Sequence, residues 1–466
     1  MASGSARPGR AACVWLQGGY VTRFIMLLVA ASAAIWIHPS AAVAGTLKVC
    51  PTGCTYSTIQ SAIDAAQTGD TIKIAPGTYT ENPRILPPTA AKQLTLEGAG
   101  ALKTIVDGNQ QDLVLEVDTD YVVTIRGVTF TNGKALPAGG ILNHGTLKLI
   151  DVTVRQNQGQ EVAGGIANDI DGTLTLIRCK VTDNEATFPP PPPPPFPPPV
   201  AVAAGAGLRN FGIASLMDTI VSGNHIVGTD GGGGGIENQG QLEVTRCRIV
   251  DNHTTKGALG GGGGLDNSRM VSVRDVPIMT VKNSLITGNT ADVGGGIHNL
   301  FGMLSVTSTP IRDNSASLSG GGLYNDFHST AELISSPIAR NVSGVDGGGV
   351  VNDRGTLTLT DSPIKKNQAV STTNGQKGGG LAVFGGTVQL KRSRVSQNTA
   401  SGPIGGLGGG IVITDAGSLT LDRSPITDNS ASTDGGGIYN FSGSASMQNS
   451  PVKDNQPDNC VNVPGC

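Results

Sequence analysis

Four ionisable residues occupy the same position in consecutive copies of a repeated segment. They are Arg209, Glu237, Asp266 and His298, each directly before an asparagine, and Tyr324 takes this position in the next copy. If the copies stack as strands, neighbours in this outward-facing row lie about 5 Å apart. Glu237 and Asp266 then form a carboxylate pair that can divide into an acid and a base, at a spacing that suits a retaining glycosidase. The alternative is a mixed-charge ladder in which Arg209 and His298 only neutralise the two acids.

Other residues offer less chemistry. His144 and His225 each stand alone in the sequence, and we expect both to be turn residues. Both tryptophans, Trp15 and Trp36, lie among the first 44 residues, and aromatic residues make up only 4% of the chain. Grooves that hold sugars commonly offer aromatic platforms, so this composition disfavours a sugar-cleaving site. Glycine-aspartate calcium repeats are missing from the sequence, and we expect neither a metal nor a cofactor.

The repeated segment carries two asparagine motifs. The first reads Gly-Gly-[Ile/Leu/Val]-x-Asn, as in 139–143 and 295–299, and the second reads [Ile/Val]-x-x-Asn. The second motif occurs eleven times, ending at Asn157, Asn184, Asn224, Asn252, Asn289, Asn314, Asn341, Asn367, Asn398, Asn429 and Asn455. Between the motifs lie segments such as 146–149 and 418–421, in which leucine alternates with polar residues. This alternation predicts short strands with leucine facing inward.

A repeat of roughly 26 residues with three short strands and no helical period is typical of one turn of a parallel β-helix. We therefore predict an all-β, single-stranded, right-handed parallel β-helix of roughly eleven coils. Identical positions then stack along the axis, so the asparagines of the second motif form a hydrogen-bonded ladder that holds tight turns. A row of prolines, such as Pro310 and Pro337, indicates a bend between sheets.

Six cysteines follow residue 44, namely Cys50, Cys54, Cys179, Cys247, Cys460 and Cys466. The first two flank a tight turn and the last two close a short loop, so we predict a disulfide near each end of the chain and an oxidising compartment. The middle two, Cys179 and Cys247, occupy the position in the repeat that serine takes in later copies. They lie two coils apart, which is too far for a disulfide. We expect them to be buried free thiols.

Residues 1–44 have the features of an export signal. Three arginines precede or open an apolar stretch at 24–37, which a small-residue motif follows at 42–44. We predict a signal peptide at 1–44, secretion, and no transmembrane helix in the mature chain. The net charge is −3 and becomes more negative without these arginines, which argues against a nucleic-acid partner.

The remaining chain divides into three parts. Residues 45–135 should form an N-terminal cap and the first coils, 136–457 the repeated coils, and 458–466 a disulfide-closed C-terminal cap. In the first part, residues 57–60 resemble a capping box before a short helix at 61–66, which can plug the end of the bore.

A proline-rich loop at 188–200 interrupts the coils and includes Pro189, Phe196 and Pro199. The run must adopt polyproline II and cannot join a sheet. Such a loop can bind a partner, and the alternative is a solvated loop without a ligand.

These features resemble two known families. The segment 50–81, with its Pro-Gly-Thr-Tyr at 76–79, resembles the N-terminal cap of secreted pectin-lyase-like β-helix proteins. The two asparagine motifs resemble the polymorphic outer membrane protein repeats of bacterial surface adhesins, with Ile or Val in place of a common Phe. Both resemblances imply the β-helix fold, which is shared by lyases, hydrolases, esterases and adhesins.

The functional expectation is a secreted or cell-surface β-helix protein without catalysis, adhesin-like or structural in a cell envelope. We expect a monomer whose partner is a polysaccharide or a surface or host protein. The alternative is a lyase or hydrolase that acts on an acidic, pectin-like polysaccharide. The sequence lacks the Asp-Asp, Gly-His-Gly and Arg-Ile-Lys motifs of polygalacturonase-like hydrolases and the Arg-x-Pro-x-x-Arg motif of pectate lyases, which favours the first expectation.

Overall fold

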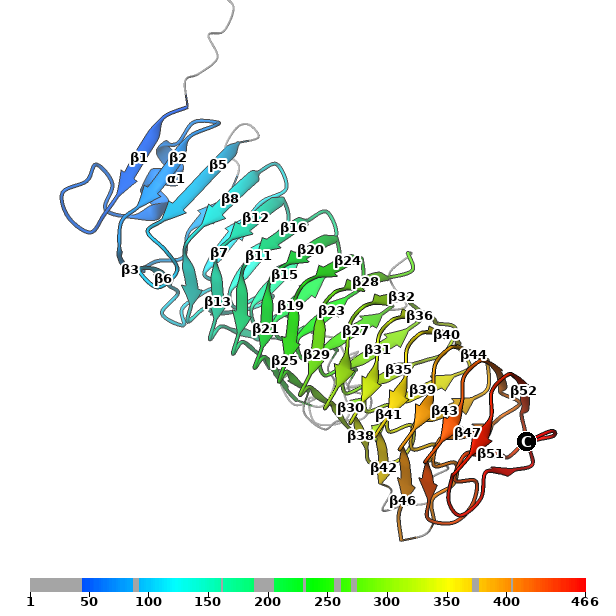
Figure 1. Ribbon diagram of the computed structural model, residues 1–466. Helices are drawn as coiled ribbons and strands as arrows, with labels where there is room; N and C mark the ends of the chain where they lie inside the picture. The colour runs from blue at the N-terminus through cyan, green and yellow to red at the C-terminus, as the bar shows by residue number, and fades with distance from the viewer. Residues whose placement is uncertain are drawn as a thin grey trace, which may run out of the picture. The chain divides into compact units, whose positions relative to one another are not determined.

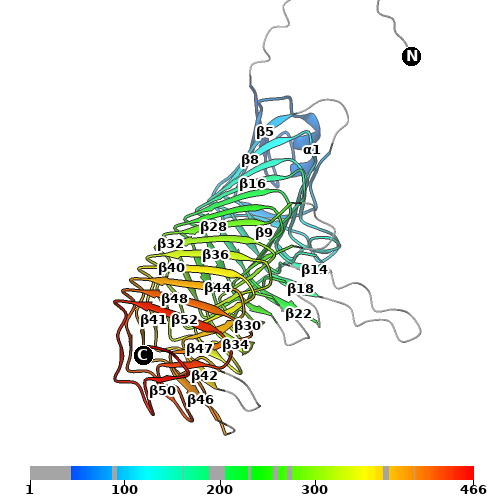
Figure 2. The same ribbon diagram turned by 90° about the vertical axis from the view of Figure 1, so that its right-hand side faces the viewer.

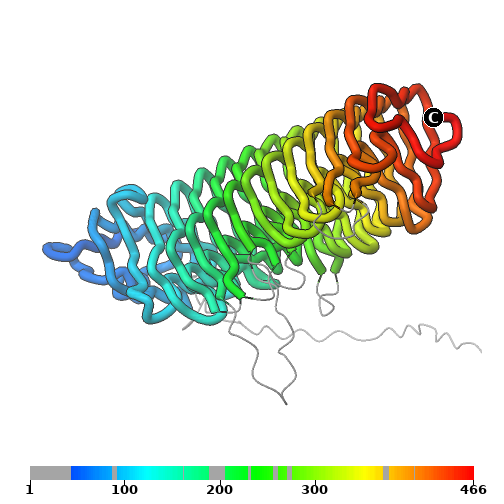
Figure 3. The backbone as a smooth tube through the Cα atoms, turned by 90° about the horizontal axis from the view of Figure 1, so that it is seen from below, coloured from blue at the N-terminus to red at the C-terminus, as the bar shows by residue number. Residues whose placement is uncertain are grey.

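The computed structural model is a parallel β-helix whose coils stack along one axis (Figure 1, Figure 3). It describes residues 44–86, 92–160, 162–187, 205–228, 232–254, 261–269, 275–370, 377–403 and 405–466. The predicted signal peptide, apart from Ala44, and the proline-rich loop with Pro189, Phe196 and Pro199 lie outside these residues. The prediction of an all-β parallel β-helix is confirmed.

The strands form four parallel sheets, which we name A to D. Sheet A has 15 strands, sheets B and C have 14 each, and sheet D has 11. One coil contributes β11 (Ile141–Asn143) to sheet C, β12 (Thr146–Ile150) to A, β13 (Thr153–Arg155) to B and β14 (Gln158–Gln160) to D. The prediction of three strands per coil is therefore wrong for coils that include sheet D, because the strands of sheet D carry neither the asparagine motifs nor the alternating leucines.

The number of coils is also larger than predicted. The solenoid has about 13 turns rather than roughly eleven, because the first turns lack the asparagine motifs that were counted. Sheet B runs from β3 (Gly77–Thr80) to β53 (Val452–Lys453), and sheet D runs from β10 (Lys134–Ala135) to β50 (Ser430–Ala431).

Sheet A contains the alternating segments, and its strands lie one above another along the rod (Figure 2). Its strands are β1 (Thr46–Val49), β2 (Thr71–Ile74), β5 (Gln93–Gly98), β8 (Val122–Arg126), β12, β16 (Thr173–Ile177), β20 (Ile213–Met217), β24 (Gln241–Thr245), β28 (Ile278–Lys282), β32 (Met303–Thr307), β36 (Thr330–Ile334), β40 (Thr356–Thr360), β44 (Thr387–Lys391), β48 (Ser418–Asp422) and β52 (Ser444–Gln448). Leu147 and Leu149 pair in register with Leu174 and Leu176, and all four are buried in the central core. Each such leucine contributes roughly 1.5–3 kcal/mol when fully buried.

Sheet C precedes sheet A in each coil. Its strands are β4 (Arg84–Ile85), β7 (Leu115–Val117), β11, β15 (Ile166–Asn168), β19 (Leu208–Asn210), β23 (Ile236–Asn238), β27 (Leu265–Ser268), β31 (Ile297–Leu300), β35 (Leu323–Asn325), β39 (Val350–Asp353), β43 (Leu381–Phe384), β47 (Ile411–Thr414), β51 (Ile438–Asn440) and β54 (Cys460–Val461). The first and third residues of a strand face the central core, where Ile141 and Asn143 are both buried. The second residue faces the other side of the sheet, because side chains alternate along a strand.

The eleven asparagines of the second motif lie in one column at the turn between sheets B and D. The side-chain amide of each of the first ten donates to the Oδ1 atom of the next asparagine over 2.9–3.0 Å, and the amide of Asn455 donates to Asn459 Oδ1 over 3.1 Å. The same Oδ1 accepts the backbone N–H of the preceding asparagine, as Asn341 does from Asn314 over 3.0 Å. Stacking therefore satisfies polar groups that are almost fully buried at every turn.

Cys179 and Cys247 are buried free thiols. They belong to a column of small residues in which each backbone N–H donates to the side chain of the next coil, as Cys247 does to Ser284 Oγ over 3.0 Å. Burial raises the pKa of both thiols to about 11. Pro310 lies at the corner that follows this column, between the end of β32 and β33 (Ile311–Arg312).

A short helix closes the N-terminal end. Helix α1 (Ile59–Ala65) begins after Thr58, whose hydroxyl accepts the backbone N–H of Ser61, and Glu81 accepts the N–H groups of Ile59 and Gln60. Ile59 and Ile63 are buried, as the predicted helical face requires. The two predicted disulfides, Cys50–Cys54 and Cys460–Cys466, are both present. Within the described residues, no helix is long and apolar enough to span a membrane.

Candidate functional site

The structure brings the predicted charged row together on sheet C. Arg209 pairs in register with Glu237, Glu237 with Asp266, Asp266 with His298, and His298 with Tyr324. Each of the five is the second residue of its strand, so all five side chains lie on the face of sheet C that points away from the central core. Apolar residues occupy this column on either side of the row, including Ala167 before it and Val351 after it.

The row faces away from the central core, as expected, but the expectation that it lies at the solvated surface is wrong, because the row is buried. The exposed fractions are 3% for Arg209, 0% for Glu237, 2% for Asp266 and 5% for His298. The cover comes from the connection that enters each strand of sheet C. Gly294 has φ +58°, and an added Cβ there would lie 2.9 Å from the Cα of His298. This left-handed glycine lets the backbone fold back over the column, where a larger residue would clash.

Arg209 and Glu237 form the first half of the row. Arg209 Nε lies 3.2 Å from Glu237 Oε2, an ion pair without the alignment of a hydrogen bond. The Gln239 amide donates to the other oxygen, Oε1, of Glu237. Burial raises the pKa of Glu237, Asp266 raises it further, and Arg209 opposes both effects. The guanidinium also lies 4.2 Å from the ring centroid of Phe211, a cation–π contact.

Asp266 and His298 form the second half. His298 Nδ1 lies 2.9 Å from Asp266 Oδ1, and Nε2 lies 3.4 Å from Asp326 Oδ2. Burial alone would lower the pKa of His298, but its hydrogen bonds to the two carboxylates outweigh burial and raise the pKa to about 9. The Ser268 hydroxyl donates to the second oxygen of Asp266 over 2.8 Å. His298 is therefore an imidazolium that bridges two acids near neutral pH.

These contacts occupy the groups that catalysis would need. Each carboxylate of the Glu237–Asp266 pair is held by a cation on one oxygen and a neutral donor on the other. A glycosidase nucleophile or acid must reach the substrate, whereas both carboxylates are at most 2% exposed. The arrangement fits a charge-balanced internal ladder, which is the alternative weighed from the sequence.

The two isolated histidines named from the sequence, His144 and His225, also have acidic partners. His144 Nδ1 lies 2.8 Å from Asp169 Oδ2, in the turns between sheets C and A. His225 Nε2 lies 2.9 Å from Glu185 Oε2, and His225 begins β22 (His225–Val227) of sheet D. The expectation that His225 is a turn residue is therefore wrong. The described residues contain no group of three or more His, Cys, Asp or Glu side chains that could hold a metal ion.

A hollow of about 560 Å³ lies beside the charged row, on the turns between sheets C and A. Phe211 and Gln239, which contact Arg209 and Glu237 from outside, form part of its wall. Ile213, Gln241 and Ile278 of sheet A complete it. Through this hollow an external ligand could approach Phe211 and Gln239, which touch the row.

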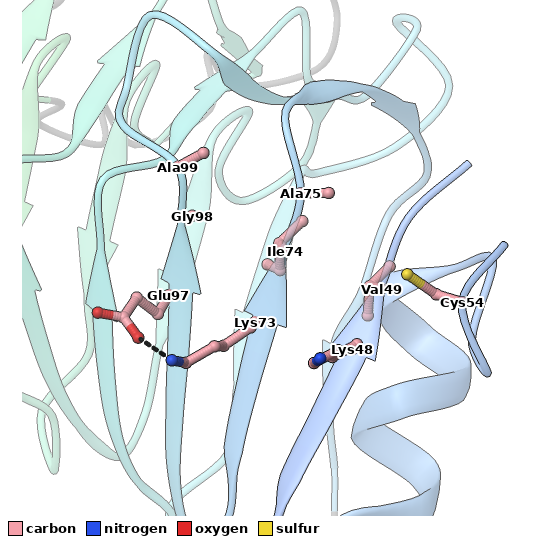
Figure 4. Close-up of a pocket in the computed structure, with 9 residues that line it drawn as sticks. All are labelled: Lys48, Val49, Cys54, Lys73, Ile74, Ala75, Glu97, Gly98 and Ala99. Atoms are coloured by element: carbon pink, nitrogen blue, oxygen red, sulfur yellow. Dashed lines mark ion pairs between the residues drawn. The ribbon is translucent and has the colours of Figure 1, made fainter. Parts of the chain in front are cut away.

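A second hollow, of about 360 Å³, lies at the N-terminal end over β1, β2 and β5 (Figure 4). Lys48 and Lys73 project from neighbouring strands there, and Lys73 Nζ lies 3.9 Å from Glu97 Oε2. The side chains of Lys73 and Glu97 are about half exposed, and this pair is a surface contact of small energetic value.

Sequence reasoning missed an aromatic edge. Five phenylalanines end or follow strands of sheet C, one or two residues after the position of the first-motif asparagine: Phe211, Phe301, Phe327, Phe384 and Phe441. All five are at least partly exposed. Their recurrence one or two residues after the first-motif asparagine was visible in the sequence. The sequence argument about sugar-binding aromatic residues considered tryptophan and did not use these phenylalanines.

The chain matches no protein-family model, and no curated protein matches it in sequence. Similar solved structures include the pectate lyase Pel9A, with 13% identity, a TM-score of 0.31, and coverage of 89% of this chain and 80% of that chain. The A-module of the mannuronan C-5 epimerase AlgE6 from Azotobacter vinelandii has 14% identity, a TM-score of 0.34, and coverage of 85% and 95%. The pectin methylesterase from carrot has 10% identity, a TM-score of 0.29, and coverage of 70% and 84%. Similarity at this level carries nothing about the chemistry of this chain.

Proposed function

We propose that this protein is an extracellular, monomeric β-helix that binds a polysaccharide without cleaving it. One observation carries the proposal. The only carboxylate pair that the sequence offered for catalysis is buried and ion-paired, whereas the exposed features beside it are apolar and amide side chains around a hollow. Shallow, partly apolar surfaces with a few polar groups are suited to holding a ligand.

Two further features support an extracellular location. The chain has two local disulfides and keeps its remaining described cysteines as buried thiols with raised pKa values. Disulfides persist in oxidising compartments, and the sequence of residues 1–44 predicts export. A rigid solenoid also offers a long surface to an extended ligand.

A polysaccharide panel tests the proposal. The protein lacking residues 1–44 is incubated with neutral and acidic polysaccharides, and both retention on the polymer and release of reducing or unsaturated ends are measured. We expect retention without product. The variants Glu237→Gln and Asp266→Asn, assayed with wild type, should also give no product. Product that appears with wild type and is lost in these variants would overturn the proposal in favour of a lyase or hydrolase.

A further inference from the structure

We propose that the aromatic edge, formed by Phe211, Phe301, Phe327, Phe384 and Phe441, binds a neutral polysaccharide that lies along the axis of the rod. This inference rests on the proposed function and specifies its site and its ligand. The edge follows the turns from sheet C to sheet A, which recur once per coil.

The placement of the phenylalanines is uneven. The described residues contain six phenylalanines, and only Phe130 lies in the central core. The other five lie on this one edge, where Phe301 is 38% and Phe441 is 63% exposed. A turn needs no aromatic residue, as Asp353 and Asp415 show in neighbouring coils. Phe384 packs on the buried cluster of Val351, Ala382 and Val412, whereas the exposed rings of Phe301 and Phe441 keep apolar area in water and mark a binding surface.

Neighbouring side chains hold several of the rings in place. Phe301 and Phe327 are edge-to-face with centroids 5.9 Å apart, and His328 lies 3.9 Å from Phe327 and 6.2 Å from Phe301. The guanidinium of Arg354 lies 5.1 Å from the Phe327 centroid. Phe211 is supported from inside by the buried Arg209. Rings fixed in this way lose little rotamer freedom when a ligand stacks on them.

The charge of the edge selects among polysaccharides. Its described acidic residues are Asp169, Asp171, Asp275, Asp326, Asp353 and Asp415. The described basic residues there are Arg269, Arg354, His144 and His328, and three of the acids, Asp169, Asp326 and Asp353, form ion pairs with His144, His298 and Arg354. A polyanion would meet a surface of its own sign, whereas the hydroxyl groups of a neutral sugar can donate to these carboxylates. The edge therefore fits a neutral chain better than a pectin-like one.

The regular spacing of the edge favours a polymer. Turns of successive coils lie about 4.8 Å apart, so the rings and acids are presented at multiples of one short distance. A ligand made of repeating units can engage several of these positions at once, and linked weak contacts add up to useful affinity. The hollow between Phe211 and Phe301 supplies Gln239 and Gln241, whose amides can both donate to and accept from sugar hydroxyls.

Affinity electrophoresis tests the site. Wild type and the variants Phe301→Ala and Phe441→Ala are run through gels that contain a soluble glucan, galactomannan, xylan, polygalacturonate or alginate. We expect retardation by at least one neutral polymer, and roughly tenfold weaker binding for each alanine variant. Phe301→Trp should bind at least as well as wild type, and Phe301→Leu should lose affinity although it keeps apolar area. Leu102→Ala, which removes a side chain that is 96% exposed outside the edge, is the matched control and should bind normally.

The outcomes separate this inference from the proposed function. If wild type is retarded by a neutral polymer and both alanine variants are retarded equally, the aromatic edge is not the site, although the protein binds polysaccharide. If only polygalacturonate or alginate retards wild type, the neutral ligand is wrong. If no polymer retards wild type, the proposed function fails as well. Thermal unfolding of each variant confirms that a loss of retardation is not a loss of structure.

Discussion

The buried imidazole of His298 should make the stability of the protein depend on pH in an alkaline window. Its pKa rises from an ordinary 6.5 to about 9 in the folded protein, because Asp266 and Asp326 accept its two N–H groups. A group whose pKa is raised by folding stabilises the folded state fully below its unfolded pKa. That stabilisation is lost as the pH rises through the folded pKa. At about 1.4 kcal/mol per pH unit, the shift corresponds to about 3 kcal/mol, lost between pH 6.5 and pH 9.

The variant His298→Gln isolates this contribution. Guanidinium unfolding followed by circular dichroism at pH 6.5 to 10 gives the free energy of unfolding of both proteins. The difference between wild type and variant should narrow by about 3 kcal/mol across this window. Titration of isotope-labelled histidine by NMR measures the same pKa directly in the folded protein. His328→Gln, which removes an exposed imidazole, is the control.

Two results would refute this reasoning. A difference in unfolding free energy that stays constant from pH 6.5 to 10 would mean that the charge of His298 does not stabilise the fold. An NMR titration of His298 near pH 6.5 would show that the two carboxylates do not hold its proton.

Three further predictions concern the columns and the chain ends. Asn314→Ala should lower the free energy of unfolding by about 3 kcal/mol, because it leaves the buried backbone and side-chain N–H groups of Asn289 without an acceptor. The control Gln368→Ala removes an exposed amide and should cost less than about 0.5 kcal/mol. Thermal or guanidinium unfolding measures both variants, and equal losses of stability would contradict the asparagine ladder. In the protein without residues 1–44, a thiol reagent at pH 8 should label no cysteine while the protein is folded, because Cys179 and Cys247 are buried and have raised pKa values. After denaturation without reductant it should label these two. Rapid labelling of the folded protein would contradict their burial. Cys460→Ser should destabilise the last coil by about 2 kcal/mol, which is the loop-closure value for a short disulfide loop. Amide hydrogen exchange should therefore become faster in the last coil and stay unchanged near the middle of the rod. An equal increase in exchange along the whole rod would contradict the prediction that the disulfide stabilises only the last coil.

The fold could be predicted because a stacked repeat turns sequence phase into structure. Ile338 and Asn341 stand in the same phase as Ile364 and Asn367, and each pair performs the same two tasks, filling the bore and closing the turn. Alignment of the motifs of successive repeats therefore predicted which residues pair in many neighbouring strands. Sheet D was missed because its strands carry no repeated motif: β18 (Glu185–Thr187) has Ala186 as its one buried residue, and neither an asparagine motif nor alternating leucines mark it.

The environment of the candidate site could not be predicted in the same way. Motif spacing places Glu237 beside Asp266, but it does not show what lies over them. Burial depends on glycines that let the connection pass close over the row, such as Gly261, where an added Cβ would lie 2.8 Å from Asp266 Cγ, and in the sequence Gly261 looks like one more member of a glycine run. The column that contains Cys179 and Cys247 is filled by cysteine, serine or threonine. Thr219 lies between the two thiols in this column, and the sequence pattern of serines did not reveal it. Chemically different residues fill one structural role there, and residue identity was a poor guide.

The loop closed by Cys50 and Cys54 has a consequence for self-association. Every sheet of an open solenoid ends in a strand with unpaired backbone groups, which is a template for another molecule. Here the loop returns Tyr56 to the free side of β1, where Cys50 N–H donates to Tyr56 O over 3.1 Å and Tyr56 N–H to Lys48 O over 3.4 Å. Helix α1 packs beside it and covers the end of the core. Reduction of this disulfide would release the loop from the edge of β1 and leave backbone groups there with which a strand of another molecule could pair.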